Sequence, residues 1–244
     1  MRSINSRISI SLSSMGTAPN TVKNNNILSP PRPCVRYAFY MTSTTAKPRR
    51  SNGLAGPAAK GVDRVLISKT RLQRRVKELA AELSAEYAEG EVVCVGALNG
   101  VICFLADLVR EMDIPAPVEL VHVDRFIDER GHTVEMPNPF RESLRGRDVL
   151  IVEDIVDTGV TLKLLVDKVL AENPASVKVC TLLDKPAHRE VDVQIDYVGF
   201  SIDPVFVVGY GLDYEGFYRN LPFVGVVDSA VWPPALLERP KFDS

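Results

Sequence analysis

The sequence predicts an α/β fold in which a parallel β-sheet is covered by helices on both faces. From Asp63 onward, helical and extended apolar patterns alternate along the chain, and such alternation is typical of parallel sheets connected by helices. Several extended segments are near-continuous runs of Val, Ile and Leu, which indicates strands buried on both sides. A chain of 244 residues accommodates one such domain with a sizeable core and a tail.

The individual elements follow from the spacing of apolar residues. A first helix is expected after Ser68, a suitable N-cap, with its apolar stripe between Leu72 and Tyr87. A long polar stretch, 124–146, interrupts the regular pattern. Two further helices are predicted at 101–112 and 162–173. The predicted strands cover residues 91–97, 118–123, 148–152, 176–183, 197–200, 205–209 and 223–227.

The first 62 residues have a different composition from the rest. They contain nine Lys or Arg and no Asp or Glu, and they lack sustained periodicity. We therefore predict a disordered extension at 1–62, a domain at 63–232 and a C-terminal tail at 233–244. Acid-free leaders rich in Ser and Arg are typical of mitochondrial or plastid transit peptides. The alternatives are a tail without an address in a cytoplasmic protein, or true initiation at Met15 or Met41.

Composition excludes several classes of function for the domain. After the first 62 residues, 20 basic and 31 acidic residues remain, a net charge of −11, whereas nucleic-acid binding favours a basic face. The apolar stretch 101–106 is far shorter than the ~20 residues of a membrane span. The cysteines show no CxxC spacing and are predicted as small buried hydrophobes in a reducing compartment. They are Cys34, Cys94, Cys103 and Cys180.

Two adjacent acids follow the aliphatic run 149–152. Glu153 and Asp154 are expected at the exit of this strand, and ligands of parallel sheets bind outside the carboxyl ends of the strands. A turn there can converge both carboxylates on one ligand. Two such acceptors suit the vicinal hydroxyls of a ribose, and they also suit Mg²⁺, which prefers carboxylate oxygen.

A loop that can hold phosphate comes next. Asp157 to Thr161 contains Gly159 and two hydroxyls directly before the third helix, and the N–H groups of a helix N-terminus bind anions. The alternative is that Thr158 and Thr161 only cap the helix. An acid pair beside a phosphate-binding loop predicts a site for a sugar phosphate.

The stretch RDVLIVEDIVDTGVTL, 147–162, resembles the phosphoribosyl-pyrophosphate motif of the type I phosphoribosyltransferases. Residues 63–228 are similar to the bacterial-type hypoxanthine-guanine phosphoribosyltransferases. The resemblance is carried also by VLISKTRLQRRVKELAAELSAEY, TLLDKPAHR, DYVGFSI and VFVVGYGLDYEGFYRNLPFVGVV. It implies the type I phosphoribosyltransferase fold with a small hood region. The implied reaction is transfer of 5-phosphoribose from phosphoribosyl pyrophosphate to hypoxanthine and guanine, giving IMP or GMP and pyrophosphate. The implied process is purine salvage, with Mg²⁺ required.

The resemblance assigns roles within the opening motif. It implies that Glu153 and Asp154 bind the ribose hydroxyls, in part through Mg²⁺. Asp157 would be the general acid/base at N7 of the purine, a role typically worth ~10²–10⁴ in rate. Its alternative role is that of a helix cap. The amides and hydroxyls of the loop would hold the 5-phosphate. The residues of this loop are Asp157, Thr158, Gly159, Val160 and Thr161.

Further roles fall on the C-terminal half of the chain. Lys185 would donate to the 6-oxo group of the purine, and Phe206 would stack on its ring, although by pattern alone Phe206 belongs to a core. The backbone of Val207 would read the purine edge. Asp213 would be a second Mg²⁺-binding carboxylate beside the purine. Arg219 would engage pyrophosphate, because its planar guanidinium makes bidentate phosphate contacts.

Leu98, Asn99 and Gly100 correspond to the pyrophosphate loop, where the family uses a cis-capable peptide. The middle position is commonly Lys or Arg in the family, so Asn99 removes one positive contact. The lid usually carries an adjacent Ser-Tyr pair, and this chain has Arg125-Phe126 instead.

We hypothesise that residues 124–140 still act as a lid that excludes water, with Arg125 or Arg130 supplying the charge that Asn99 lacks. His132 in this loop is expected to be a solvent-exposed residue and not a catalyst.

The expected partners are a 6-oxopurine and phosphoribosyl pyrophosphate, with neither nucleic acid nor membrane, in a homodimer or homotetramer as in related proteins. Two alternatives stay open. One is a non-catalytic nucleotide-binding regulator, and the other is a phosphoribosyltransferase that prefers xanthine.

Overall fold

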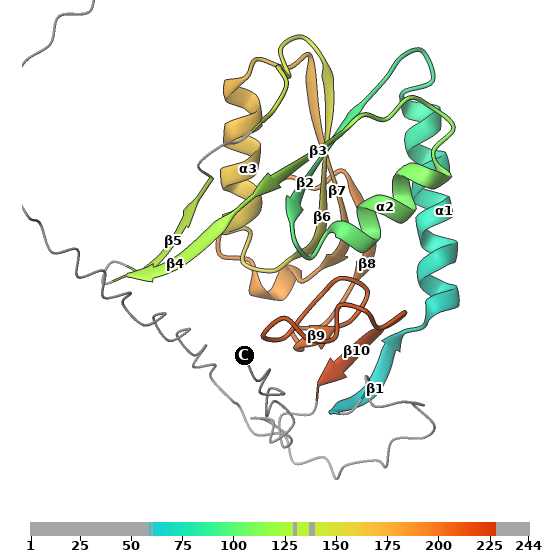
Figure 1. Cartoon of the computed structure of the whole chain (residues 1–244), viewed down its shortest axis with the longest axis vertical. Coiled ribbons are helices and arrows are strands. Elements are labelled where there is room, and N and C mark those ends of the chain that lie inside the picture. The colour runs from blue at the N-terminus through green and yellow to red at the C-terminus, as the bar shows by residue number, and fades with distance from the viewer. Residues whose placement is uncertain (1–58, 60, 129–130, 137–139, 228–244) are drawn as a thin grey trace, which may run out of the picture. The chain divides into compact units, whose positions relative to one another are not determined.

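The computed structural model describes residues 59, 61–128, 131–136 and 140–227, and the side chains of 124–135 are not described. The C-terminal tail, Cys34 and Arg130 lie outside these residues, and so does the predicted transit peptide except for Ala59, Gly61 and Val62. Val62 begins a strand of the domain. Five parallel strands form the central sheet in the order β3-β2-β6-β7-β8 (Figure 1). They are β2 (Val93–Leu98), β3 (Val118–His122), β6 (Asp148–Val156), β7 (Ser176–Asp184) and β8 (Tyr197–Ser201). The predicted α/β class is confirmed.

The helices cover both faces of the sheet, as predicted. α1 (Lys69–Glu86) and α2 (Ile102–Glu111) lie on one face, and α3 (Val160–Ala171) lies on the other (Figure 1). The arrangement follows from the strands, because successive residues of a strand point to opposite faces. Leu150 of β6 packs in the cluster of α1 and α2, and its neighbour Ile151 packs in the cluster of α3.

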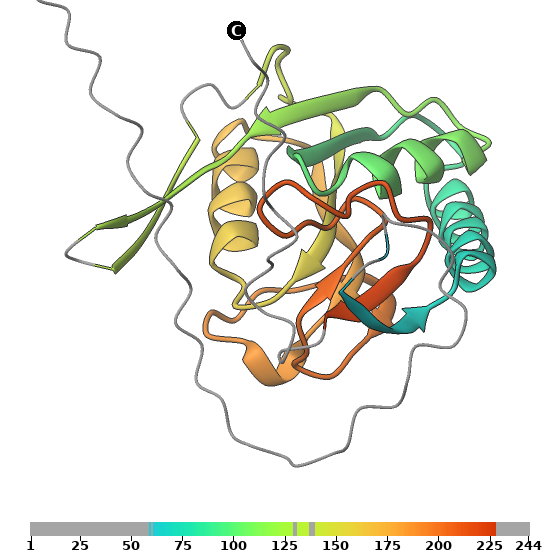
Figure 2. The same cartoon turned by 60° about the horizontal axis from the view of Figure 1, so that its bottom comes forward.

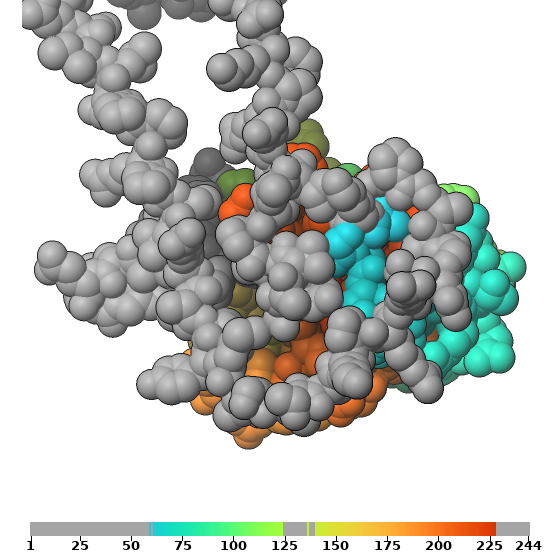
Figure 3. Space-filling model, turned by 90° about the horizontal axis from the view of Figure 1, so that it is seen from below, coloured from blue at the N-terminus to red at the C-terminus, as the bar shows by residue number. Residues whose placement is uncertain are grey.

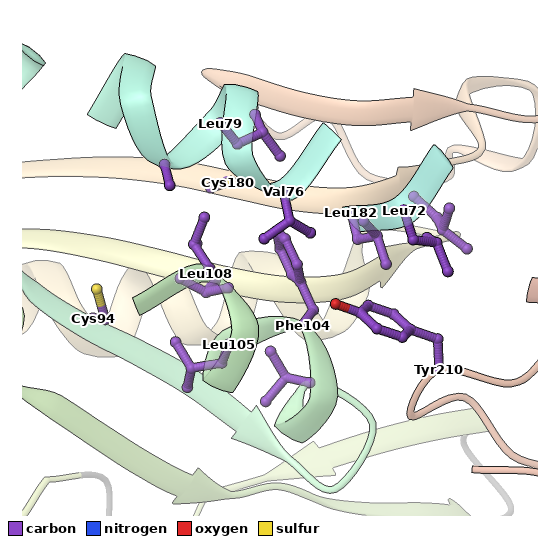
Figure 4. Packing of buried hydrophobic residues seen from close by; sticks show 14 of the residues in the cluster. Leu72, Val76, Leu79, Cys94, Phe104, Leu105, Leu108, Cys180, Leu182 and Tyr210 are labelled. Carbon is purple, nitrogen blue, oxygen red and sulfur yellow. The ribbon is translucent and has the colours of Figure 1, made fainter. Parts of the chain in front are cut away.

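The larger core cluster joins α1 and α2 to the sheet. Leu72, Val76 and Leu79 come from α1, and Phe104 and Leu108 come from α2 (Figure 4). All five side chains are at most 2% exposed, and fully burying a side chain of this kind contributes roughly 1.5–3 kcal/mol. Because both helices pack on the sheet, the loops at the ends of the strands start from fixed positions.

The predicted start of α1 is confirmed. The side chain of Ser68 accepts a hydrogen bond from the backbone N–H of Arg71 at 3.4 Å. A Ser at this position satisfies one of the N–H groups that a helix leaves open at its first turn.

A second, smaller sheet forms the hood. It joins β1 (Val62–Ile67), β10 (Val224–Val227) and β9 (Val207–Val208) in antiparallel pairs, and β1 lies beside the C-terminal strands (Figures 2 and 3). Its own core is small and consists of Ala59, Val62, Val208 and Leu221. The hood therefore depends on segments from both ends of the domain.

Three expectations differ from the structure. β6 does not end at Val152, because its pairing with β7 continues from Glu153 opposite Thr181 to Val156 opposite Asp184. The polar stretch contains a hairpin, β4 (Asp124–Asp128) and β5 (Gly131–Glu135), which projects from the sheet beside α3 (Figure 1). In addition, β9 is shorter than the predicted strand 205–209. Within the described residues, no helix has both the length and the apolarity to span a membrane.

Candidate active site

The predicted site residues gather at the carboxyl end of the central sheet. The loop 98–100 follows β2, the loop 157–159 follows β6, and residues 185–191 follow β7. Because β2, β6 and β7 are parallel neighbours, the three loops leave the same edge. Such an edge is where ligands bind in open α/β sheets.

The acid pair lies within β6 and not after it. Glu153 is buried, with 5% exposure, while Asp154 is only partly buried. No turn converges the two side chains, because strand pairing with β7 continues past both residues. Asp154 is placed at the pyrophosphate loop: a Cβ on Gly100 would lie 1.7 Å from its Oδ2. The expected use of both acids by a single ribose therefore stays a prediction.

Two glycines join the pyrophosphate loop to the hood. The peptide between Leu98 and Asn99 is cis, as the family resemblance implied. A Cβ on Gly211, whose φ is +100°, would lie 2.1 Å from the carbonyl oxygen of Gly100. The two backbones can approach this closely only because Gly211 has no side chain.

Asp213 and Arg219 lie on the hood side of this junction. Nη2 of Arg219 is 2.9 Å from Oδ1 of Asp213, and its Nη1 donates to the carbonyl of Gly211 at 2.7 Å. The backbone N–H of Gly216 donates to Oδ2 of Asp213 at 2.7 Å. The structure thus brings the predicted pyrophosphate-binding residues Arg219 and Gly100 to one place, with Asp213 beside them.

The surroundings of the junction hold two further titratable groups. The hydroxyl of Tyr210 donates to Oδ2 of Asp107 at 2.7 Å, and burial together with this bond raises the pKa of Tyr210. Burial and the nearby Asp107 raise the pKa of the Cys103 thiol, which Arg219 opposes. Cys94 lies deeper, and burial raises its pKa to about 12. Tyr210 is therefore a neutral hydrogen-bond donor that ties the hood to α2.

The phosphate loop ends at the N-terminus of α3. Gly159 is the N-cap, with φ +90°, and no side chain caps the helix. The hydroxyl of Thr158 accepts from the N–H of Val160 at 3.4 Å, and Thr161 lies inside the helix. Thr158 therefore accepts from the first N–H of α3, as the capping alternative expects, whereas Thr161 lies within the helix. Binding of an anion by the other N–H groups of the first turn stays a prediction.

Asp157 is in contact with two nitrogen-bearing side chains. Nζ of Lys185 lies 3.0 Å from its Oδ2, and Nδ1 of His188 lies 3.0 Å from its Oδ1. Lys185 is 5% exposed, so its ammonium is placed in the site and not in bulk water. Sequence reasoning missed His188, because the 3₁₀ turn Pro186–His188 that brings it to Asp157 is not evident from the sequence.

Among the predicted purine-binding residues, Lys185 follows β7 of the central sheet, and the others lie in or near β9 of the hood. Val207 is buried in β9, whereas Phe206 is 50% exposed. The pattern of the sequence alone suggested a core residue at Phe206, and the structure shows that it is not one. The rings of Phe206 and Tyr214 meet edge to face, with centroids 6.1 Å apart. An exposed aromatic face at this end of the molecule suits stacking on a planar base.

The structure describes side chains in the predicted pyrophosphate loop but not in most of the predicted lid. Asn99 is exposed. Arg125, Phe126 and His132 lie in the β4–β5 hairpin, and their side chains are outside the described part. The lid hypothesis and the expected exposure of His132 therefore stay predictions.

A parallel sheet, a glycine-containing loop at a helix N-terminus, a carboxylate beside a lysine and a small hood together form the arrangement expected of a phosphoribosyltransferase. The family model for the phosphoribosyl transferase domain matches residues 66–215. The chain is 41% identical over 173 residues to the hypoxanthine-guanine phosphoribosyltransferase of Bacillus subtilis (strain 168), covering 70% of this chain and 96% of that protein. It is 42% identical over 167 residues to the hypoxanthine phosphoribosyltransferase of Salmonella typhimurium, covering 67% and 94%.

The comparison with a solved structure supports the same family. The hypoxanthine phosphoribosyltransferase of Staphylococcus aureus superposes with a TM-score of 0.70 at 35% identity, covering 74% of this chain and 99% of that one. The chain belongs to the phosphoribosyltransferases, and among them to the hypoxanthine-guanine phosphoribosyltransferase family.

Proposed function

We propose that this protein transfers 5-phosphoribose from phosphoribosyl pyrophosphate to hypoxanthine and guanine, giving IMP or GMP and pyrophosphate in purine salvage. The observation that carries the proposal is the contact of Lys185 with Asp157, directly before the phosphate-binding N-terminus of α3. A non-catalytic binding protein would not need a proton acceptor and a purine-reading cation at the same place.

The chemistry follows from the charges of these side chains. A carboxylate has oxygens that can take up a proton, so Asp157 can accept the N7 proton of the purine. N9 then forms its bond to C1 of the ribose as the bond from C1 to pyrophosphate breaks. The negative charge of Asp157 also stabilises positive charge that develops on the sugar.

Lys185 would set the preference for 6-oxopurines. Its buried ammonium is only a donor, and it meets an acceptor in the 6-oxo group of hypoxanthine or guanine. Adenine would present another donor, and an unpaired buried donor can reduce kcat/KM by roughly 10⁴.

Mg²⁺ fits the oxygen donors at this edge. Among the described residues, no three His, Cys, Asp or Glu side chains form a metal site of their own, and Mg²⁺ is commonly held by one or two carboxylates together with substrate phosphates. We propose Glu153 and Asp154 as such carboxylates in the sheet, and Asp213 as a further Mg²⁺-binding carboxylate on the hood side. When bound, the ion would neutralise charge on the diphosphate.

We propose that the β4–β5 hairpin acts as the lid over this site, with Arg125 contacting the diphosphate. The support is its position directly after β3, whose carboxyl end lies at the same edge. The expected effect of Arg125→Ala is a raised KM for phosphoribosyl pyrophosphate, and an unchanged KM would end the proposal for Arg125.

The experiment is a steady-state absorbance assay of the purified protein with Mg²⁺, phosphoribosyl pyrophosphate and each of hypoxanthine, guanine, xanthine and adenine. We expect turnover with the first two and none with adenine. Highest kcat/KM for xanthine would support the xanthine-preferring alternative. Binding of phosphoribosyl pyrophosphate in a calorimeter without turnover would support the non-catalytic one. We also propose a homodimer or homotetramer, to be measured by light scattering.

A further inference from the structure

Both oxygens of the Asp157 carboxylate are held by one short segment after β7. Nζ of Lys185 lies 3.0 Å from Oδ2, and Nδ1 of His188 lies 3.0 Å from Oδ1. The reaction as derived above uses Asp157 and Lys185 but gives His188 no role.

The local fold explains why Lys185 and His188 reach the same carboxylate. Residues Pro186–His188 form one turn of 3₁₀-helix, and the backbone N–H of His188 donates to the carbonyl of Lys185 at 3.1 Å. Lys185 is the N-cap of this turn and His188 is its last residue. The turn therefore brings an ammonium and an imidazole to the same carboxylate.

The backbone fixes this turn against the catalytic loop. The N–H of Lys185 donates to the carbonyl of Val156 at 3.0 Å. The N–H groups of Glu190 and Val191 both donate to the carbonyl of Thr158, at 2.9 and 3.0 Å. These three bonds bracket Asp157, so the position of His188 relative to Asp157 does not depend on a bound substrate.

The protons that each group can carry determine which of the two donates the hydrogen bond. An ionised carboxylate can only accept hydrogen bonds, while each ring nitrogen of His can carry a proton. Nδ1 of His188 must therefore donate to Oδ1 of Asp157. This bond forms both in the neutral tautomer protonated at Nδ1 and in the imidazolium.

We propose that His188 is a positioning residue for Asp157, holding Oδ1 so that Oδ2 faces the N7 proton once Lys185 donates to the purine 6-oxo group. The inference rests on the proposed function. Lys185 cannot fill both roles at full strength, because its contact with Oδ2 competes with the purine. A general base oriented by a third group is a recurrent arrangement in active sites.

The neighbouring cation, Arg189, pairs with a different carboxylate. The guanidinium of Arg189 bonds to Oδ1 of Asp184, and its stem lies under Gly159, where a Cβ would come 3.0 Å from Cδ of Arg189. Among the described side chains of residues 186–191, it is His188 that contacts the Asp157 carboxylate.

Two substitutions at His188 test the proposal. His188→Ala removes the donor, and loss of an orienting partner typically lowers activity by ~10–100-fold. We expect that loss in kcat, with the KM for phosphoribosyl pyrophosphate within about 2-fold of wild type, because the phosphate and pyrophosphate loops are untouched. His188→Asn places an amide N–H where Nδ1 stands, and we expect it to recover most of kcat. Glu190→Gln, at an exposed side chain of the same segment, is the matched control and should resemble wild type.

A kcat for His188→Ala within about 2-fold of wild type would overturn the proposal. An Asn variant as slow as the Ala variant, with an unchanged melting temperature, would do the same.

A second measurement does not need turnover. In ¹⁵N-labelled protein, NMR of the His188 ring should show a proton on Nδ1, and Asp157→Asn should shift that resonance. A ring protonated only at Nε2 overturns the inference even if the enzyme is active. If the wild type turns over no purine, the proposed function fails, and the NMR result alone decides whether His188 holds Asp157.

Discussion

The central sheet and the hood support one site in different ways. In the sheet, the site loops leave buried parallel strands that pack between helices on both faces. In the hood, Phe206 precedes and Asp213 follows a strand of two residues, and the hood core among the described residues is a cluster of four buried hydrophobic side chains. The part of the molecule with the larger core holds the proposed proton-transfer residue, and the part with the smaller core holds residues predicted to bind the purine and pyrophosphate. Substitution of Asp157 at the edge of the sheet should therefore change kcat, and substitutions in the hood should change KM.

The largest effect is expected for Asp157→Asn. The amide fills the same space but cannot take the N7 proton, so kcat should fall by ~10²–10⁴, with little change in either KM. Steady-state assays with hypoxanthine measure the loss, and a thermal melt confirms that the variant is folded. A positioned base contributes at least ~10² in rate, so a fall of less than about tenfold would place the proton transfer elsewhere.

The junction between the two regions should be nearly as sensitive. Gly211→Ala places a Cβ 2.1 Å from the carbonyl oxygen of Gly100, whereas Gly216→Ala, also at positive φ, meets nothing within 4 Å. Both variants carry the strain of positive φ for a residue with a Cβ. Overpacking should cost the Gly211 variant a further ~1–3 kcal/mol in the free energy of unfolding. Its KM for phosphoribosyl pyrophosphate should rise as well, because Gly100 lies in the pyrophosphate loop.

Urea unfolding of the two variants side by side measures this difference. Equal losses of stability would mean that the hood can move away from Gly100 without penalty, and the proposed junction would then be wrong.

Within the hood, Phe206→Ala sharpens the comparison. Stacking of an aromatic side chain on a base is worth ~1–3 kcal/mol, so the KM for hypoxanthine should rise about 5- to 100-fold while kcat changes little. The ring is 50% exposed, so stability should hardly change. Phe217, which is 44% exposed and has no assigned role, supplies the control variant Phe217→Ala. Similar effects of the two substitutions would remove Phe206 from the purine site.

The sheet was far more predictable from sequence than the hood. Buried parallel strands are near-continuous apolar runs, so β2, β6 and β7 are visible in a local window. The edge at which they end then fixes the position of Asp157 and of the phosphate loop. The acid pair misled the prediction of the strand end, because polar residues inside β6 are tolerated where the sheet faces a ligand.

The hood depends on information that no local pattern contains. β1 pairs with β10 across most of the domain, from Val62 opposite Val227 to Ile67 opposite Val224, and no local window reports such a pairing. The approach of Gly211 to Gly100 is equally non-local. The contact of His188 with Asp157 required a 3₁₀ turn that three residues of sequence do not specify. The roles of the hood residues came from family resemblance alone, and geometry now supplies the neighbours against which they can be tested.

The smallest effect is expected for Asn99→Lys, which returns the positive charge common in the family to the pyrophosphate loop. Asn99 is exposed, so the new ammonium stays solvated, and exposed ion pairs contribute only ~0.2–1 kcal/mol. The KM for phosphoribosyl pyrophosphate should therefore fall by at most about 5-fold. The gain in affinity should shrink as salt is added, because exposed charges are screened. Asn99→Gln lengthens the side chain without charge and is the control. If the lysine variant gains nothing at low salt while Arg125→Ala raises the same KM, the charge missing from the sheet loop is already supplied by the β4–β5 hairpin.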